Sequence, residues 1–317
     1  RIATPICKGE ETITSTYNVV KTMDNTPYQL DKRLVRESFD RAAAGYDEVA
    51  ILQREIGQRL LERLDLIKLQ PRAIVDVGAG TGELGAALAK RYKGSEVIQL
   101  DLAPRMLQRA RARQGLVERW WGKQRFVCGD AEQLPLADNS VDLVFSNFAI
   151  QWCSDLDRAF QEFQRVLRPG GLLLFTTFGP DTLTELRQAW RAVDTDVHVN
   201  TFIDMHDIGD ALMRARLADP VMDAEHLTLT YQEGMGVMRD LKAMGAHNVS
   251  AGRHHGLTGK RKLKQMLAAY EQFRNNDGLL PATYEVVYGH AWGSEAQAGQ
   301  HREDGTVQVP LSQLKRG

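Results

Sequence analysis

The stretch AIVDVGAGTGELG, residues 73 to 85, determines how this chain of 317 residues is interpreted. An apolar run that ends in closely spaced glycines is typical of a buried strand, a tight turn and a following helix. Gly80, Gly82 and Gly85 spell G-x-G-x-x-G, the fingerprint of nicotinamide and flavin sites. Gly78, Gly80 and Gly82 spell G-x-G-x-G after an acidic residue, the form usual in enzymes that bind S-adenosylmethionine. The loop alone leaves both cofactors open.

The segments after the loop alternate between strands and helices as far as Phe178. EVIQLD (96–101), RFVCGD (125–130) and VDLVFSN (141–147) have the apolar character of strands, and RPGG (168–171) has that of a turn. Such alternation predicts a parallel sheet with helices on both faces, whose ligands bind beyond the carboxyl ends of the strands. Four helical patterns after residue 179 are expected to form a lid. HLTLTYQ (226–232) and ATYEVVYGHAW (282–292) are expected to close the sheet as an antiparallel pair.

The composition is that of an ordinary globular protein. Hydrophobic residues make up 43% of the chain and charged residues 26%, and the formal net charge is -1. A chain without a global basic field gives no reason to expect a nucleic-acid partner. Cys7, Cys128 and Cys153 show neither a disulfide nor a zinc-ligand spacing, and no apolar run is long enough for a membrane span. We therefore expect a cytoplasmic protein with no metal site and no membrane partner.

Three acidic residues favour S-adenosylmethionine over a dinucleotide. Asp76 lies in the first strand just before the glycines, where enzymes of this kind commonly carry an acid that organises the loop and the methionine amine. Asp101 ends the second strand, where a carboxylate suits the ribose hydroxyls of either cofactor. Asp130 follows the third strand and is suited to accept from the adenine amine. Each of these residues alone could be a capping residue or a turn residue. Their placement together, at consecutive strand ends, indicates a binding site.

This succession of segments resembles the class I S-adenosylmethionine-dependent methyltransferases. The resemblance implies a Rossmann-like α/β fold: a mostly parallel seven-stranded sheet with helices on both faces and a helical lid. The residues expected to hold the cofactor are Asp76, Gly78, Gly80, Gly82, Asp101, Leu102, Asp130, Ala131, Asn147 and Trp152.

Longer segments narrow the resemblance to one family. SFDRAAAGYDEVAILQREIGQRLLERL (38–64), SNFAIQWCSDLDRAFQEFQRVLRPGG (146–171) and DLKAMGAHN (240–248) look like the malonyl-acyl-carrier-protein O-methyltransferases of biotin synthesis, the BioC family. The resemblance covers roughly Asp31 to Trp292. We therefore divide the chain into a loosely ordered tail (1–30), a methyltransferase domain (31–292) and a polar tail (293–317). Within the domain we expect first helices and cofactor core over 31–178, a lid with an added strand over 179–280, and the last strand over 281–292.

The family resemblance implies a reaction and two catalytic residues. The reaction is methyl transfer from S-adenosylmethionine to the free carboxylate of a malonyl thioester on acyl carrier protein or coenzyme A, with S-adenosylhomocysteine as the other product. A carboxylate is ionised at neutral pH, so it needs no general base, but the site needs a cation to grip it. Arg187 is the first candidate and Lys242 the second. Tyr46 matches the family tyrosine expected to close over the cofactor. For Arg187 and Lys242 the alternative is a solvated charge on a helix, and for Tyr46 it is ordinary packing of the N-terminal helix.

A basic stretch, GRHHGLTGKRKLK (252–264), is a candidate docking site for an acidic acyl carrier protein, although such a run is usually a solvated helix face. Its cations are Arg253, Lys260, Arg261, Lys262 and Lys264. Three other functions stay open. The chain could methylate another acid, or bind S-adenosylmethionine without catalysis. It could also act like the mitochondrial complex I assembly factors, which FGPDTLTELR (178–187) resembles as well.

Overall fold

A computed structural model of the chain describes residues 30–115, 122–245, 259–295, 300–301 and 307–308. The predicted tails, 1–30 and 293–317, lie almost wholly outside these residues, and so does Arg253 of the basic stretch. Within the described residues, no helix is long and apolar enough to cross a membrane.

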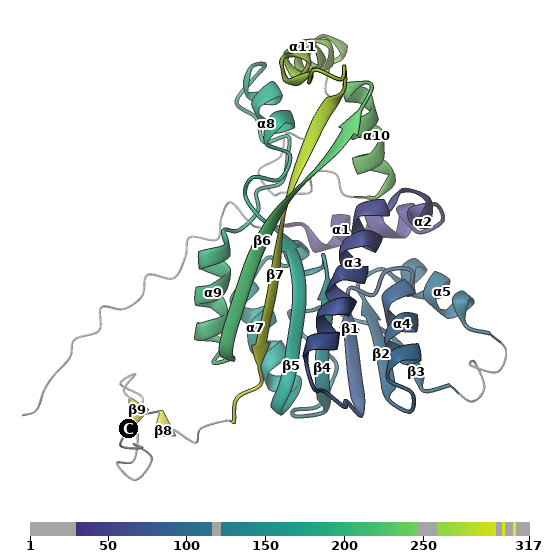
Figure 1. Cartoon of the computed structure of the whole chain (residues 1–317), viewed down its shortest axis with the longest axis vertical. Coiled ribbons are helices and arrows are strands. Elements are labelled where there is room, and N and C mark those ends of the chain that lie inside the picture. The colour runs from purple at the N-terminus through teal and green to yellow at the C-terminus, as the bar shows by residue number, and fades with distance from the viewer. Residues whose placement is uncertain (1–29, 116–121, 246–258, 296–299, 302–306, 309–317) are drawn as a thin grey trace, which may run out of the picture.

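One seven-stranded sheet forms the centre of the molecule (Figure 1). The strand order is β3-β2-β1-β4-β5-β7-β6; the first five strands run parallel, and β7 runs antiparallel to both β5 and β6. The strands are β1 (Ala73–Val77), β2 (Glu96–Asp101), β3 (Gln124–Cys128), β4 (Val141–Asn147), β5 (Leu167–Phe178), β6 (Ala218–Tyr231) and β7 (Leu280–Trp292). This confirms the predicted fold class. The strand order turns back between β1 and β4, which is where folds of this kind bind ligands.

Two strands are longer than the sequence pattern predicts. β6 begins at Ala218 rather than at His226, and it lies at the edge of the sheet, where Pro220 costs no hydrogen bond to a neighbouring strand. β5 begins at Leu167, so the RPGG segment lies inside the strand instead of forming the predicted turn. The pairing of β5 with β4 shifts register at this point, and Gly170 has a φ of 74°.

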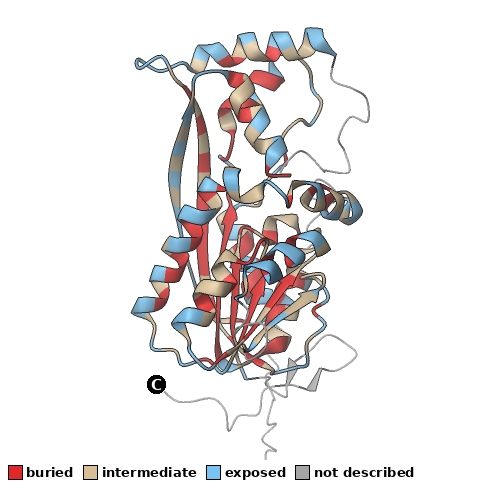
Figure 2. Ribbon diagram, turned by 90° about the vertical axis from the view of Figure 1, so that its right-hand side faces the viewer, coloured by how far each residue is buried: buried red, intermediate tan, exposed pale blue. Residues whose placement is uncertain are grey.

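Side chains of successive strand residues enter two hydrophobic cores, one on each face of the sheet. Ile74 of β1 packs with residues of α3 (Ile51–Arg63), α4 (Glu83–Arg91) and α8 (Thr184–Arg191). Val75, the next residue, packs with residues of α7 (Leu156–Val166) and α9 (Met205–Arg214) on the other face. Figure 2 shows the resulting pattern: the strands are mostly buried, and the outer sides of the helices are exposed. Helices therefore cover both faces, as predicted.

The first helices cross the carboxyl ends of the parallel strands. α1 (Lys32–Ala42) is capped by Asp31, whose side chain accepts hydrogen bonds from the amides of Arg33 and Leu34. The sequence predicts two helices in this region, whereas the chain forms three, because it breaks both before and after the short α2 (Tyr46–Val49). α5 (Pro104–Arg113) opens at its proline, as predicted, and packs against β2, β3 and α1.

The lid consists of α8, α10 (Gly234–Ala243) and α11 (Lys260–Tyr270), which gather around the far ends of β6 and β7 (Figure 1). One of the four helical patterns expected to form this lid, MHDIGDALMRARL (205–217), does not belong to it. α9 packs against α7 and β6, because Ile208, Ala211 and Leu212 are buried in the core on that face of the sheet.

Candidate functional site

The glycine loop after β1 approaches the neighbouring chain closely. Gly78, Gly80 and Gly82 all have positive φ angles, of 75°, 56° and 82°, which only glycine adopts at little cost. A Cβ atom on Gly78 would lie 2.2 Å from the Cβ of Ala149. The amide of Gly78 donates to the carbonyl of Leu100 at 2.8 Å, which ties the loop to the end of β2. The loop thus leaves open space above Gly80, where a ligand can lie against the backbone.

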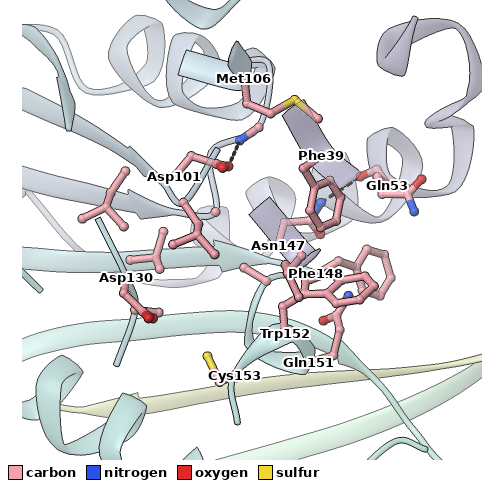
Figure 3. A pocket seen from close by; sticks show the side chains of 18 of the residues that line it. Phe39, Gln53, Asp101, Met106, Asp130, Asn147, Phe148, Gln151, Trp152 and Cys153 are labelled. Carbon is pink, nitrogen blue, oxygen red and sulfur yellow. Dashed lines mark hydrogen bonds between the residues drawn. The ribbon is translucent and has the colours of Figure 1, made fainter. Parts of the chain in front are cut away.

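Asp101 holds this loop from the end of β2. Its Oδ2 accepts a hydrogen bond from the amide of Gly80 at 2.8 Å (Figure 3). Its Oδ1 accepts one from the amide of Ala103 at 2.8 Å. Burial raises the pKa of Asp101 to about 6, and the two amides oppose this rise. A carboxylate oriented in this way at the rim of a cavity suits a ligand that offers hydroxyl donors.

Asp76 lies beneath the loop and is not one of the residues that line the cavity. It pairs in register with Gln99 of β2, and its Oδ2 is buried without a hydrogen-bond partner in the described structure. Burial and then the charge of Asp101 raise the pKa of Asp76 to about 7. Direct contact with a cofactor, as expected from the sequence, is therefore not what this geometry supports; Asp76 underlies the loop.

A cavity opens at the carboxyl ends of β1, β2 and β4, at the predicted place (Figure 3). Nine of the predicted site residues line it: Tyr46, Gly78, Gly80, Asp101, Leu102, Asp130, Ala131, Asn147 and Trp152. Gly82 does not line it but forms the N-terminal cap of α4. Other residues of the cavity wall come from α1, α3, β5 and the segment after α10, and the sequence pattern did not indicate them. They are Lys32, Val35, Phe39, Gln53, Phe178 and Met244.

Polar contacts hold α1 and α2 over this cavity. The ammonium of Lys32 lies 2.7 Å from Asp130 and 2.8 Å from Glu132. Near the other side, Asp47 accepts a hydrogen bond from the hydroxyl of Thr81 at 2.5 Å, beside the glycine loop. The N-terminal helices therefore form one wall of the site, and their residues depend on tertiary contacts for their place in it.

Tyr46 lies in the wall of the cavity, where burial and the charges of Asp101 and Asp47 hold the pKa of its phenol far above the usual value. Tyr46 is therefore neutral at physiological pH and can donate a hydrogen bond into the cavity.

A second, larger cavity lies between the first helices and the lid. Among the residues that the structure describes, four line both cavities: Gln53, Trp152, Phe178 and Met244. The cations that line the second cavity within the described part of the chain are Arg41, Arg239 and Lys242. His198 also lines it and stacks on the ring of Trp190. The two cavities thus adjoin at the four shared residues, and two ligands that react with each other could lie on either side of this junction.

Arg187, the first candidate for gripping a substrate carboxylate, lines neither cavity. Its guanidinium donates to the carbonyl of Pro180 at 2.7 Å and to that of Thr182 at 2.8 Å. These two carbonyls belong to the loop between β5 and α8, whose amides at Gly179 and Leu183 donate to carbonyls of β7. In this structure Arg187 stabilises the loop that precedes α8, and Lys242 is the sequence candidate that reaches a cavity wall.

Comparisons with known proteins agree with this geometry. A family model described as a methyltransferase domain matches residues 75–175. The YcgJ protein of Bacillus subtilis has a similar fold, with a TM-score of 0.53 and 19% identity over 75% of this chain and 98% of its own. A putative methyltransferase of Bacillus halodurans gives the same score and identity over 74% and 99%. The fold and the cavity at its strand ends define a class I, S-adenosylmethionine-dependent methyltransferase.

Curated relatives narrow this class to one family. A malonyl-[acyl-carrier protein] O-methyltransferase of a Methylovorus species is 59% identical over 85% of this chain and 92% of its own length. The protein of the same name from Gallionella capsiferriformans is 55% identical over 84% and 92%. The chain belongs to the malonyl-[acyl-carrier protein] O-methyltransferase family.

Proposed function

We propose that this enzyme transfers the methyl group of S-adenosylmethionine to the free carboxylate of malonyl-acyl carrier protein, as the first step toward the pimeloyl unit of biotin. The names of its relatives supply the substrate. The observation that carries the proposal is the junction of the two cavities at Gln53, Trp152, Phe178 and Met244, because a cofactor and a separate acid must meet there. The cytoplasmic location stays a prediction from the scattered cysteines.

The residues of the first cavity fit the cofactor. Asp101 would hold the ribose hydroxyls, the free oxygen of Asp130 would accept from the adenine amine, and the backbone at Gly78 and Gly80 would face the methionine end. Asp130 keeps this capacity because Lys32 and the amide of Glu132 both bind its Oδ1. When bound, S-adenosylmethionine supplies an electrophilic methyl group on a positively charged sulfur.

The chain needs to position the reactants rather than move a proton. The substrate carboxylate would already be ionised, so its oxygen could take up the methyl group directly and no residue of the chain would need to act as a base. Aromatic side chains exclude water from the junction: Phe39 packs edge-on against Trp152, and Phe148 stacks on Phe178. Desolvation and alignment of this kind are established sources of rate acceleration.

Lys242 is the cation that best fits the substrate carboxylate. It lines the second cavity, and within the described residues it has no ion-pair partner. Arg239, one turn earlier on α10, lies 3.6 Å from Glu233, and Arg41 contacts Ser38 and Glu37 of its own helix. An ammonium that is free of a competing acid can bind an incoming carboxylate at a lower cost.

The start of α11 is the docking surface we propose for the acyl carrier protein. Lys260, Arg261 and Lys264 are exposed there, and Leu263 beside them lines the second cavity. Lys262, by contrast, lies 2.7 Å from Asp194 and 3.5 Å from Asp196, so its charge is already paired within the lid. The docking set therefore excludes Lys262.

Mass spectrometry of malonyl-acyl carrier protein after incubation with the enzyme and S-adenosylmethionine tests this function. We expect the mass to rise by one methyl group, through an ester that alkali removes, and acetyl-acyl carrier protein to stay unchanged because it has no free carboxylate. Methylation of a small acid but not of the carrier protein would favour the alternative acid substrate. Cofactor binding without any ester would contradict the proposal and favour a binding or assembly role.

A further inference from the structure

Tyr46, which lies in the wall of the cofactor cavity, belongs to a helix of a single turn. α2 contains four residues, Tyr46–Val49, and Gly45 before it offers no side-chain cap. A helix this short is not stable on its own, because few hydrogen bonds follow to offset the cost of its first turn. The place of Tyr46 in the cavity wall therefore depends on contacts between α2 and the rest of the chain.

Asp47, the residue after Tyr46, makes such contacts with both oxygens of its carboxylate. Its Oδ1 accepts a hydrogen bond from the hydroxyl of Thr81 at 2.5 Å, and its Oδ2 accepts one from the guanidinium of Arg113 at 2.5 Å. The same guanidinium donates to the backbone carbonyl of Thr81 at 2.7 Å, which closes a ring of three residues. This ring of Asp47, Thr81 and Arg113, the α2 clasp, ties α2 to the glycine loop and to the last turn of α5.

The glycine loop gives the α2 clasp a fixed point of attachment. Thr81 is buried between Gly80 and Gly82, and the amide of Gly80 is itself held by Asp101. None of the three residues of the clasp lines either cavity, so their side chains are not the ones that a ligand there would touch. They can act on a bound ligand only through a neighbour, and the neighbour that lines the cofactor cavity is Tyr46.

We propose that Asp47 and Arg113 are positioning residues, which hold Tyr46 against the bound cofactor. The proposal rests on S-adenosylmethionine as the cofactor of the proposed function. The side chains of Asp47 and Arg113 are 34% and 35% exposed, and an ion pair so accessible to water contributes little to the stability of the whole fold. Its effect is local: it fixes a turn that has no cap of its own, and with it the aromatic ring in the cavity wall.

The test is a double-mutant cycle on the affinity of the full chain for S-adenosylmethionine, measured by calorimetry without any methyl acceptor. We expect the affinity to fall about fivefold in Asp47→Ala and about tenfold in Tyr46→Ala. The double variant should lose no more than Tyr46→Ala alone, because Asp47 acts through the ring that is then absent. The control is Asp65→Ala, which breaks an ion pair of the same length, 2.5 Å to Arg91, between residues that line neither cavity. It should leave the affinity within about twofold of wild type.

Three results would overturn the proposal. Losses that add up in the double variant would mean that Asp47 affects the cofactor by a route other than Tyr46, which is what a purely structural role predicts. An unchanged affinity in Asp47→Ala, or in Tyr46→Ala, would contradict it directly. Thermal unfolding of each variant identifies a folding defect, and if Asp47→Ala does not fold, the cycle between Arg113→Met and Tyr46→Ala decides.

The experiment also separates this proposal from the proposed function. Because no methyl acceptor is present, the result does not depend on whether malonyl-acyl carrier protein is the substrate. A wild-type chain that does not bind S-adenosylmethionine would contradict the proposed function itself. Binding by wild type together with additive losses would contradict only the role of the α2 clasp.

Discussion

The ammonium of Lys32 lies 2.7 Å from Oδ1 of Asp130, and this ion pair joins the first helix to the loop after β3 across the cofactor cavity. Lys32 also lies 2.8 Å from Glu132. Because only about a quarter of the Lys32 side chain is exposed, at 26%, the pair is less screened by water than a surface ion pair. The contact therefore holds a wall of the site in place as well as stabilising the fold.

Replacing this lysine should weaken cofactor binding. In Lys32→Met the first helix loses its link to the loop after β3, and the affinity for S-adenosylmethionine is expected to fall about fivefold, mainly through faster dissociation. Calorimetry and stopped-flow fluorescence measure the two effects. The control is Arg33→Met, because Arg33 is exposed and, among the described residues, its ion pair is with Glu37 of its own helix. An unchanged dissociation rate in Lys32→Met would mean that the ion pair does not keep the site closed.

The glycine loop should be far more sensitive to a methyl group than other turns with the same backbone. Gly78→Ala combines a strained φ with a Cβ that would lie 2.2 Å from Ala149, and we expect a loss of about 2–4 kcal/mol of stability together with cofactor binding. Gly94 has a φ of 95° but open space around it, so Gly94→Ala should cost only about 1–2 kcal/mol and leave binding intact. Denaturant titration and calorimetry of both variants make the comparison; equal effects would contradict the importance of the close approach.

Asp76 gives the stability a dependence on pH. Burial raises its pKa in the folded protein to about 7 from an ordinary value of 3.8, so the folded state binds the proton more tightly than the unfolded state. Its contribution is complete below the unfolded pKa and is lost as the pH rises through about 7. In wild type the free energy of unfolding should therefore decrease between about pH 4 and about pH 7, and Asp76→Asn should make this decrease smaller. The decrease that remains in the variant comes from Asp101 and should end near the pKa of Asp101, about 6.

Urea titrations at several pH values in this range measure the slope for wild type and variant. Asp277→Asn, at an exposed loop residue, is the control and should leave the slope as it is. A slope that is the same in Asp76→Asn and in wild type would show that Asp76 does not retain its proton in the folded state.

Lys242 and Arg187, the two residues that the sequence offered for binding the substrate carboxylate, should differ in which property their replacement changes. Lys242→Met should raise KM for malonyl-acyl carrier protein about tenfold at unchanged cofactor affinity, since an ionic contact with the substrate is lost. Arg187→Met should instead lower stability by about 1–3 kcal/mol, because the carbonyls of Pro180 and Thr182 lose their donors. Steady-state kinetics and denaturant titration of both variants are needed. A raised KM with normal stability in Arg187→Met would restore the original assignment.

Charge reversal on α11 tests the docking surface. Arg261→Glu and Lys264→Glu should each raise KM for malonyl-acyl carrier protein several-fold, more strongly at low salt, and leave the affinity for S-adenosylmethionine unchanged. Lys90→Glu, on an exposed turn of α4 away from the lid, is the matched control. Equal KM values for all three variants would exclude this face of α11 as the docking site.

The candidate site was predictable from the sequence where its residues follow one another along the chain. Each of four site residues follows or ends a strand: Gly78, Gly80, Asp101 and Asp130. Parallel strands bring their carboxyl ends together, so the alternation of strands and helices in the sequence is enough to predict that these residues lie close to one another. The start of β6 was not predictable in this way. It is an edge strand with one side open to solvent, and its first half, with Pro220 and Asp223, has little apolar pattern.

The sequence by itself determined the class of this protein, because a strand, a glycine loop and a helix are local features whose residue types are fixed by backbone geometry and burial. Only the tertiary structure decided which side chains line the site. Lys32 and Asp130 are 98 residues apart, and Asn147 and Gln53 are 94 apart, so no local pattern relates them. Arg187 shows the converse: its chemistry suits a carboxylate, but the fold places the carbonyls of Pro180 and Thr182 within 2.7 and 2.8 Å of its guanidinium, so these carbonyls take its donors.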